Sequence, residues 1–299
     1  MTQLMLWQLP FAQLITEFNM KFYCIHKKDY LPNQLLKKSC QERGIDFVSV
    51  DPDDKKQIDN LNLTKDDLLY RVITSKNGFR AEKKLIKSKV TTFYKKNPLA
   101  LKNIPNTVIH CDNPKIPTPK TIFGITKDRD VLRQQVKDLG GFPIILKVLG
   151  GQHGIGVMKI DSFSSLFSVI DYLLSIKKPE DFMLRQYINT DKTARFIVVG
   201  DKVVDTLEYK ARDDDFRSNE GDDPIHYEAK YPKELKDIAV EALNCLGLEF
   251  GGVDILIENG KPYLAETNFP CFFPKPQLYN NSDISGKMVD FLVAKSKSA

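Results

Sequence analysis

Hydrophobic and polar positions alternate along the chain in a way that predicts a succession of strands and helices. The apolar run 21–25, a helical pattern over 31–43 and a second apolar run over 46–50 together predict a β-α-β beginning. A further strand is predicted over 67–74, and a basic helix follows it over 79–87. This alternation of the two periodicities indicates an α/β chain with α+β lobes.

A proline-rich segment over 113–120 separates this beginning from the rest, because proline interrupts helices and favours extended backbone. Polar stretches such as 51–59 are predicted to be loops. The other predicted elements are a short strand over 91–94, helices over 127–139, 162–174 and 232–246, and strands over 142–148, 156–160, 182–186, 194–199, 202–209, 250–257 and 262–268. The expected division is an extension over 1–19 that need not be ordered, an N-terminal α/β lobe over 20–112, a central lobe over 113–183 and a C-terminal lobe over 184–299.

Composition and charge argue against several classes of partner. The net charge of +5 is modest, and positive and negative residues are interspersed along the chain. Because no stripe of Lys and Arg lies between aromatic residues, no nucleic-acid partner is expected. No apolar run approaches the ~20 residues needed to cross a bilayer, so no membrane partner is expected either. The five cysteines are scattered without a CxxC pair. That spacing favours a reducing cytoplasm over a disulfide framework or a structural zinc site.

Three oxygen-bearing side chains converge in the last predicted hairpin. Asp254 lies in its first strand, and Glu266 and Asn268 lie in its second. A three-residue loop at 259–261 would place Asp254 opposite Glu266, and strand alternation would put Asn268 on the same face. Neighbouring carboxylates repel unless a cation separates them, and Mg²⁺ prefers such hard oxygen ligands. The set predicts a Mg²⁺ site, with a surface hairpin of solvated acids as the alternative.

A glycine-rich segment and a nearby lysine indicate phosphate binding. Residues 150–156 lack the Lys-Ser or Lys-Thr of a Walker loop, but their backbone N–H groups can approach phosphates where side chains would clash. Lys147 lies in an apolar strand, where an ammonium is costly to bury without an anionic partner. Arg195, Arg217 and Asn219 add donors that a triphosphate requires. The alternatives are a plain mobile hairpin and a lysine on the solvent face.

Six motifs occur in the order seen in ATP-grasp ligases, and they most resemble the RimK-type branch, which attaches amino acids such as glutamate to carboxylates. They are Lys147 with GGQHGIGV, the hinge-like RQYI from Arg185, RFIVVGD from Arg195, DFRSN from Asp215, GGVDI from Gly251 and ETN from Glu266. The resemblance covers residue 116 to the C-terminus and extends more weakly over the N-terminal lobe. It implies an ATP-grasp fold of three lobes, with the nucleotide held between the central and C-terminal lobes.

The resemblance also implies a role for each motif. Lys147 would contact the α- and β-phosphates of ATP, under a closing lid formed by Gly151, Gln152, His153, Gly154, Ile155 and Gly156. The backbone of Gln186, Tyr187 and Ile188 would hold adenine. Asp254, Glu266 and Asn268 would bind Mg²⁺, for which Mn²⁺ could substitute. The groups facing the transferring phosphoryl group would be Arg195, Arg217 and Asn219, assisted by Lys210.

A cytoplasmic ATP-dependent carboxylate–amine ligase is therefore expected, which forms an amide through an acyl phosphate. Its expected substrates are a small-molecule carboxylate and amine, with a peptide or protein terminus as another acceptor, and the resemblance is compatible with a homo-oligomer. The alternatives are a short-peptide or natural-product ligase of the same fold, and an ATP-binding regulatory protein that has lost catalysis. Thr193, Gln186 and the segment 269–273 depart from the branch, which usually holds an acid, a glutamate and a small-residue turn there.

Overall fold

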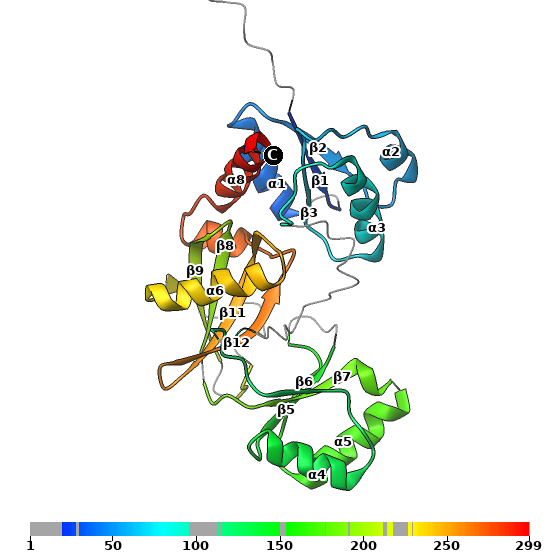
Figure 1. Ribbon diagram of the computed structural model, residues 1–299, viewed down its shortest axis with the longest axis vertical. Coiled ribbons are helices and arrows are strands. Elements are labelled where there is room, and N and C mark those ends of the chain that lie inside the picture. The colour runs from blue at the N-terminus through cyan, green and yellow to red at the C-terminus, as the bar shows by residue number, and fades with distance from the viewer. Residues whose placement is uncertain are drawn as a thin grey trace, which may run out of the picture.

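Three groups of helices and strands follow one another along the long axis of the molecule, each built around its own sheet (Figure 1). The computed structural model describes residues 20–27, 30–95, 113, 115–149, 154–176, 178–190, 192–211, 214–217, 227–228 and 230–298. The expected extension over 1–19 lies outside the described residues. The expected α/β chain with α+β lobes is confirmed, since one sheet is parallel and two are antiparallel.

The N-terminal lobe is a three-stranded parallel sheet in the order β2-β1-β3. Strands with helices on both sides are buried on both faces, and β1 and β3 are accordingly almost entirely apolar or aromatic. The predicted β-α-β beginning is confirmed. The elements are β1 (Lys21–Ile25), α1 (Leu31–Gln41), β2 (Asp46–Val50), α2 (Lys55–Asn60), β3 (Leu68–Arg71), α3 (Lys76–Leu85) and the 3-10 helix η1 (Ile86–Ser88).

Two predictions for this lobe are wrong. The stretch 51–59 was predicted to be a loop but contains most of α2, which begins where the Asp54 carboxylate accepts a hydrogen bond from the N–H of Gln57. The predicted strand over 91–94 makes only isolated bridges, from Thr91 and from Tyr94. A single side-chain cap is enough to start a short helix in a polar stretch that has no apolar periodicity.

The central lobe is a four-stranded antiparallel sheet, in the order β4-β7-β5-β6, with α4 and α5 packed against it. Asp128 caps α4, because its carboxylate accepts from the N–H groups of Asp130 and Val131. The expected limit at residue 183 falls inside β7. The elements are β4 (Thr121–Phe123), α4 (Arg129–Asp138), β5 (Ile144–Val148), β6 (Val157–Ile160), α5 (Phe163–Ile176), the 3-10 helix η3 (Pro179–Asp181) and β7 (Phe182–Gln186).

The C-terminal lobe is a five-stranded antiparallel sheet in the order β10-β9-β8-β11-β12, with α6 against one face. Helix α8 then returns to pack against α1 of the N-terminal lobe. The elements are β8 (Lys192–Val199), β9 (Lys202–Lys210), β10 (Tyr227–Glu228), α6 (Lys233–Cys245), β11 (Phe250–Glu258), β12 (Lys261–Asn268), α7 (Pro274–Tyr279) and α8 (Ile284–Ser298).

The hairpin of β11 and β12 has a shorter loop than predicted. Glu258 pairs with Lys261, so the loop consists of two residues, Asn259 and Gly260, and the three-residue prediction is wrong. Both loop residues have positive φ, 50° at Asn259 and 77° at Gly260. That backbone is what a tight two-residue hairpin turn requires, and asparagine and glycine adopt it most readily.

The same hairpin contains an extra residue that compensates for the shorter loop. Ile255 pairs with Leu264, whereas the preceding residue, Asp254, pairs with Glu266. Ala265 therefore has no partner on β11 and forms a β-bulge. The predicted pairing of Asp254 with Glu266 is confirmed, but the bulge produces it.

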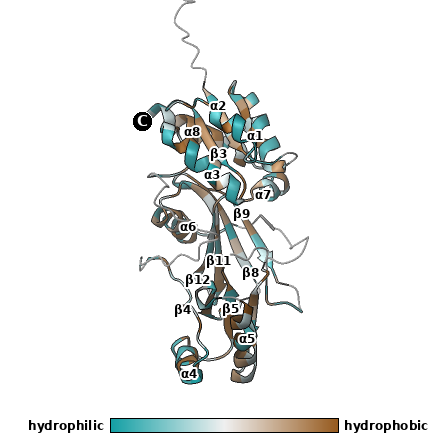
Figure 2. Cartoon of the chain, turned by 90° about the vertical axis from the view of Figure 1, so that its right-hand side faces the viewer, coloured by the Kyte–Doolittle hydropathy of each residue, from teal (hydrophilic) through white to brown (hydrophobic). Residues whose placement is uncertain are grey.

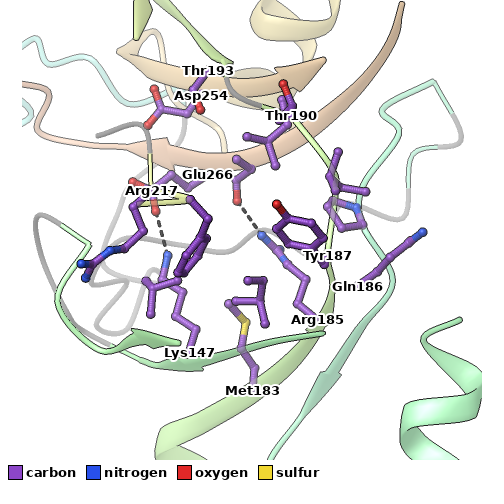
Figure 3. Close-up of a pocket in the computed structure, with 17 residues that line it drawn as sticks. Lys147, Met183, Arg185, Gln186, Tyr187, Thr190, Thr193, Arg217, Asp254 and Glu266 are labelled. Atoms are coloured by element: carbon purple, nitrogen blue, oxygen red, sulfur yellow. Dashed lines mark hydrogen bonds and ion pairs between the residues drawn. The ribbon is translucent and has the colours of Figure 1, made fainter. Parts of the chain in front are cut away.

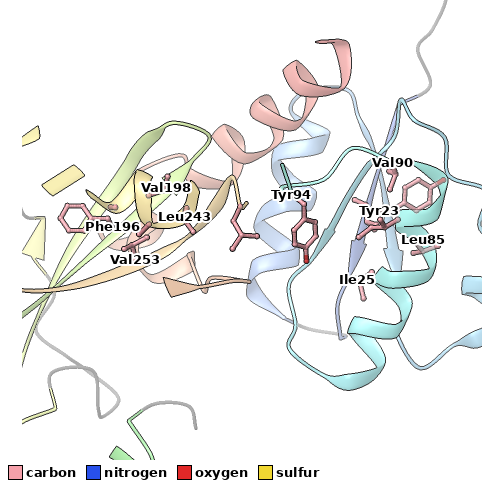
Figure 4. Close-up of a cluster of buried hydrophobic side chains, with 14 of the residues drawn as sticks. Tyr23, Ile25, Leu85, Val90, Tyr94, Phe196, Val198, Leu243 and Val253 are labelled. Atoms are coloured by element: carbon pink, nitrogen blue, oxygen red, sulfur yellow. The ribbon is translucent and has the colours of Figure 1, made fainter. Parts of the chain in front are cut away.

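Two hydrophobic clusters each extend from the N-terminal lobe into the C-terminal lobe. Tyr23 and Leu85 belong to one contiguous cluster with Phe196 and Leu243 (Figure 4). A second cluster links β1 to β11 and α8, and the central lobe has a separate cluster of its own. Figure 2 shows hydrophobic residues around β3 and β5 and hydrophilic residues on the outer helices α1 and α3.

Among the cysteines, Cys24, Cys40 and Cys271 are buried free thiols, whereas Cys245 at the end of α6 is disulfide-bonded. The sequence argued against a disulfide framework, and the bond at Cys245 is a single exception that spacing along the chain could not reveal. Across the described part of the chain, every helix is too short or too polar to span a bilayer.

Candidate active site

A pocket lies between the sheet of the central lobe and the sheet of the C-terminal lobe (Figure 3). Its floor consists of Ile145 and Lys147 from β5 and Met183 and Arg185 from β7. These side chains share one face, because Ile145 pairs with Arg185 and Lys147 pairs with Met183. Other residues that line the pocket come from the hinge at the end of β7, from the C-terminal sheet and from the segment 214–217. They include Gln186, Tyr187, Ile188, Thr193, Phe216, Arg217, Asp254, Leu256, Ala265 and Glu266.

The predicted metal ligands lie together on one face of the β11–β12 hairpin. Asp254 is 3% exposed, and Glu266 faces it across the ladder. Asn268 donates from Nδ2 to Asp254 Oδ2 and to Glu266 Oε1, at 3.2 Å in both cases. Two carboxylates this close and this enclosed repel one another unless cations offset their charge.

Two cations of the protein lie beside these carboxylates. Lys147 Nζ is 2.9 Å from Glu266 Oε2, the contact dashed in Figure 3, and Arg195 donates from Nε and Nη2 to the two oxygens of Asp254, each at 2.6 Å. Burial raises the pKa of Asp254, and Arg195 opposes this rise. Burial alone would raise the pKa of Glu266, but Lys147, Arg195 and Asn268 together lower it. Lys147 and Arg195, two candidate phosphate contacts, are thus each paired with a candidate metal ligand.

The donor set fits a divalent cation of the Mg²⁺ type. Two carboxylates and an amide oxygen are hard ligands, and Mg²⁺ is usually held by one or two carboxylates together with substrate phosphates and water. A 180° turn of the Asn268 amide would present its oxygen in place of its nitrogen. In the residues that the structure describes, no three His, Cys, Asp or Glu side chains form a metal-binding group, and the set of two acids and one amide stays a prediction.

The segment 214–217 covers one side of the pocket. Arg217 donates from Nη2 to Asp215 Oδ2 at 2.8 Å and from Nη1 to the carbonyl of Gly154 at 3.3 Å. The Phe216 ring meets the Tyr187 ring edge-on, with their centroids 6.5 Å apart. Arg217 therefore joins this segment to the glycine-rich hairpin while it lines the pocket.

The described part of the glycine-rich hairpin comprises Gly154, Ile155 and Gly156. Gly154 and Gly156 have φ of 72° and 82°, which glycine adopts without strain. Ile155 is 69% exposed, and neither it nor the two glycines line the pocket. The other predicted phosphate-side residues lie outside the described residues, namely Gly151, Gln152, His153 and Asn219.

The predicted adenine-binding hinge does line the pocket. Gln186 Oε1 accepts a hydrogen bond from the N–H of Lys120 at 3.3 Å, which turns this side chain toward the chain before β4. Lys159 lies with Nζ 4.7 Å from the centre of the Tyr187 ring. Lys210, in contrast, is exposed at the end of β9 and is not brought into the pocket. A direct contact of Lys210 with bound nucleotide is not supported by this position.

Sequence reasoning missed two residues of the site. Arg185 begins the RQYI motif but was not predicted to line the site, although its alternation with Met183 on the strand next to Lys147 places it on the pocket face. Tyr209 lies under Arg195, whose guanidinium carbon is 5.0 Å from the ring centre and whose Nη1 is 3.3 Å from Oη. The signal for both was strand alternation relative to a cation already identified.

Lys147→Met is expected to weaken ATP binding by about 1.5–3 kcal/mol, the range for hydrogen bonds made by charged groups. The methionine keeps the aliphatic volume of the side chain but removes its charge. In the parent, that charge is paired with Glu266, and the phosphates of ATP would take the place of Glu266. Titration calorimetry with a non-hydrolysable ATP analogue measures the change. Lys192→Met, at an exposed ion pair with Glu208 in the C-terminal sheet, is the control. Equal affinity in Lys147→Met and the parent would mean that Lys147 only balances Glu266.

Comparisons with known proteins agree on the fold. The structure of the ATP-grasp ligase PsnB complexed with minimal precursor superposes with a TM-score of 0.68 at 18% identity, covering 92% of this chain and 99% of that one. D-alanine–D-alanine ligase from Bacillus anthracis has a TM-score of 0.62 at 16% identity, covering 93% and 98%. The expected ATP-grasp fold is confirmed.

Sequence comparisons identify the branch. A "Probable alpha-L-glutamate ligase" of Vibrio parahaemolyticus serotype O3:K6 is 30% identical over 181 residues, 60% of this chain and 59% of that protein. One of Enterobacter sp. (strain 638) is 32% identical over 171 residues, 56% of each chain. The match thus spans less than two thirds of these curated relatives. The family model described as RimK-like ATP-grasp domain matches residues 86–292, and the chain therefore belongs to the RimK-like ATP-grasp family.

Proposed function

We propose that this protein is an ATP-dependent carboxylate–amine ligase that forms an amide through an acyl phosphate. The proposal is carried by one pocket that brings Lys147, Arg217, Asp254 and Glu266 together, with Arg195 behind Asp254. Cations for a polyphosphate and oxygen ligands for Mg²⁺ thus meet in a single site. The relatives named as glutamate ligases support an amino acid such as glutamate as the amine.

The proposed ligands are ATP and Mg²⁺. The structure of PsnB complexed with minimal precursor, Mg and ADP supports this choice, because that protein shares the fold. We propose the cytoplasm as the location of the protein, because the ATP that the reaction consumes is available in the cytoplasm. Bound Mg²⁺ would supply charge neutralisation on the phosphate oxygens, and Asp254, Glu266 and Asn268 would hold it.

The reaction has two steps. A carboxylate oxygen of the first substrate attacks the γ-phosphorus of ATP, the bond to the bridging oxygen breaks, and ADP leaves. The amine nitrogen then attacks the acyl carbon, phosphate leaves, and the proton of the amine passes to phosphate or solvent. Arg195 and Arg217 supply guanidinium donors for the charge that develops on the transferring group. No nucleophile of the protein is needed.

A second candidate is a ligase whose acceptor is a peptide. The segment after Asn268 favours it, because Phe272 is 40% exposed and its ring lies 6.1 Å from that of Tyr30 in the N-terminal lobe. A partly exposed aromatic pair that follows the strand of Glu266 suits the apolar side chains of a peptide. The solved structures of PsnB and of the macrocyclase MdnC from Microcystis aeruginosa MRC, at TM-scores of 0.69 and 0.65, contain precursor peptides.

Phosphate and ADP release tests the proposal. Purified protein is given Mg·ATP with panels of amino acids and peptides, and mass spectrometry detects products whose mass is the sum of two substrates less water. Phosphate release that requires both a carboxylate and an amine, with such a product, supports a ligase. Nucleotide binding without turnover across both panels would contradict it and favour the regulatory alternative.

A further inference from the structure

The turn of the last hairpin would, by itself, separate the two acidic ligands. Glu258 pairs with Lys261 across the two-residue turn. A regular ladder continued from that pair would place Val253, not Asp254, opposite Glu266. Because successive residues of a strand point to opposite faces, Glu266 would then lie on the face away from Asp254.

The bulge at Ala265 removes this mismatch. It shifts the register by one residue, so that Asp254 and Glu266 face one another. The extra residue of a bulge is left unpaired by the ladder, and β12 is the edge strand of its sheet among the strands that the structure describes. The geometry of the acidic pair therefore depends on whatever holds the backbone of Ala265.

Arg185 holds that backbone from the other lobe. Its Nη1 donates to the carbonyl of Ala265 at 2.8 Å, and its Nε donates to Thr121 Oγ1 at 2.9 Å. The N–H of Leu264 donates to the carbonyl of Pro117 at 2.7 Å, so the central lobe contacts the bulged strand at two successive residues. Figure 3 shows Arg185 rising from the pocket floor toward this strand, with a dashed line ending on its guanidinium.

The burial of Arg185 is consistent with a fixed position. The side chain is 8% exposed, and burial lowers its pKa to about 10 while the charge of Glu266 opposes the change. A guanidinium with that pKa remains protonated at neutral pH. Hydrogen bonds from an ionised donor are shorter and stronger than neutral ones, which suits a contact that must hold a bulge in one conformation.

We propose that Arg185 is a positioning residue for the metal site, which holds the bulge at Ala265 and thereby keeps Glu266 beside Asp254. The inference rests on the proposed function, since it takes Asp254 and Glu266 as ligands of a divalent cation. Groups that orient metal ligands without touching the metal typically change metal affinity by about 10- to 100-fold. Arg185 acts on the affinity for the cation more than on the affinity for the nucleotide.

Mn²⁺ binding to the full chain tests this inference. Mn²⁺ affinity is measured by electron paramagnetic resonance in the presence of a non-hydrolysable ATP analogue, and the affinity for the analogue is measured separately in chelator. Arg185→Met should lower the Mn²⁺ affinity about 10- to 100-fold and change the metal-free analogue affinity less. Arg185→Lys, which keeps a cationic donor, should recover part of the loss. Arg133→Met, on the outer helix α4, is the matched control and should match the parent.

The outcomes separate this inference from the proposed function. Parent protein that binds no Mn²⁺ with the analogue would overturn both. Parent and Arg185→Met with equal Mn²⁺ affinity would overturn the inference alone. A loss confined to metal-free analogue affinity would also overturn it, because Arg185 would then be only a wall of the nucleotide pocket. Thermal midpoints of all variants show whether each protein is folded at the temperature of measurement.

Discussion

Glu266→Gln is expected to lower the rate of ATP-dependent amide formation by more than about 100-fold. Loss of a residue that only orients a metal ligand costs up to about that factor, and loss of a ligand should cost more. The substitution keeps the shape of the side chain and one oxygen, but it removes one of the two carboxylate charges that accept hydrogen bonds from Asn268. Initial rates of phosphate release at several Mg²⁺ concentrations measure the effect. The loss of rate should persist at high Mg²⁺ concentration. A cation bound without the Glu266 carboxylate would no longer lie where it offsets the charge that develops on the transferring phosphoryl group.

The same variant should bind metal-free ATP at least as well as the parent. In the parent, Lys147 is paired with Glu266 at 2.9 Å, so phosphates must compete with a carboxylate for it. Glutamine competes less. Glu208→Gln is the control, because Glu208 lies in the same sheet and forms a similar ion pair with Lys192 away from the pocket. Parental rates in Glu266→Gln would contradict the metal assignment.

Arg217→Lys is expected to cut ligation by about 10²-fold or more, as when a transition-state donor is lost, while ATP affinity changes little. Lysine keeps the charge but cannot present the two parallel N–H donors of a guanidinium to a phosphoryl group. Lys147 and the metal would still hold the nucleotide. Rates under saturating ATP, compared with calorimetric ATP affinity, separate the two effects.

Asp215→Asn distinguishes this role from a purely local one. Arg217 is ion-paired with Asp215 at 2.8 Å, so a structural role for that pair predicts equal losses in Asp215→Asn and Arg217→Lys. A role in phosphoryl transfer predicts a much smaller loss in Asp215→Asn, which leaves the guanidinium in place. Equal and small effects in the two variants would remove Arg217 from the catalytic set.

The sequence was sufficient to predict most strands and the acidic pair, because both depend on local patterns. Strand alternation places Asp254, Glu266 and Asn268 on one face once the first two are opposite each other. The reason for that pairing was not predictable. A three-residue loop and a two-residue loop with a bulge give the same partners, and only the backbone distinguishes them.

What the sequence did not reveal depends on contacts between lobes. Arg185 meets Ala265 across 80 residues of chain, and Lys147 meets Glu266 across 119. No periodicity reports such distant partners. The pairing of Lys147 with Glu266 and of Arg195 with Asp254 could not be predicted for the same reason.

The distribution of the hydrophobic clusters determines which part of the molecule can move when a ligand enters. The N- and C-terminal lobes share two clusters, so separating them would expose buried apolar surface at roughly 25 cal/mol per Å². The central lobe has its own cluster, and its Lys147–Glu266 ion pair with the C-terminal sheet is a contact that phosphates and a cation could replace at little net cost. We therefore expect ligand entry to displace the Lys147–Glu266 contact first, while the Arg185–Ala265 contact and the aromatic surface at Tyr30 and Phe272 stay in place.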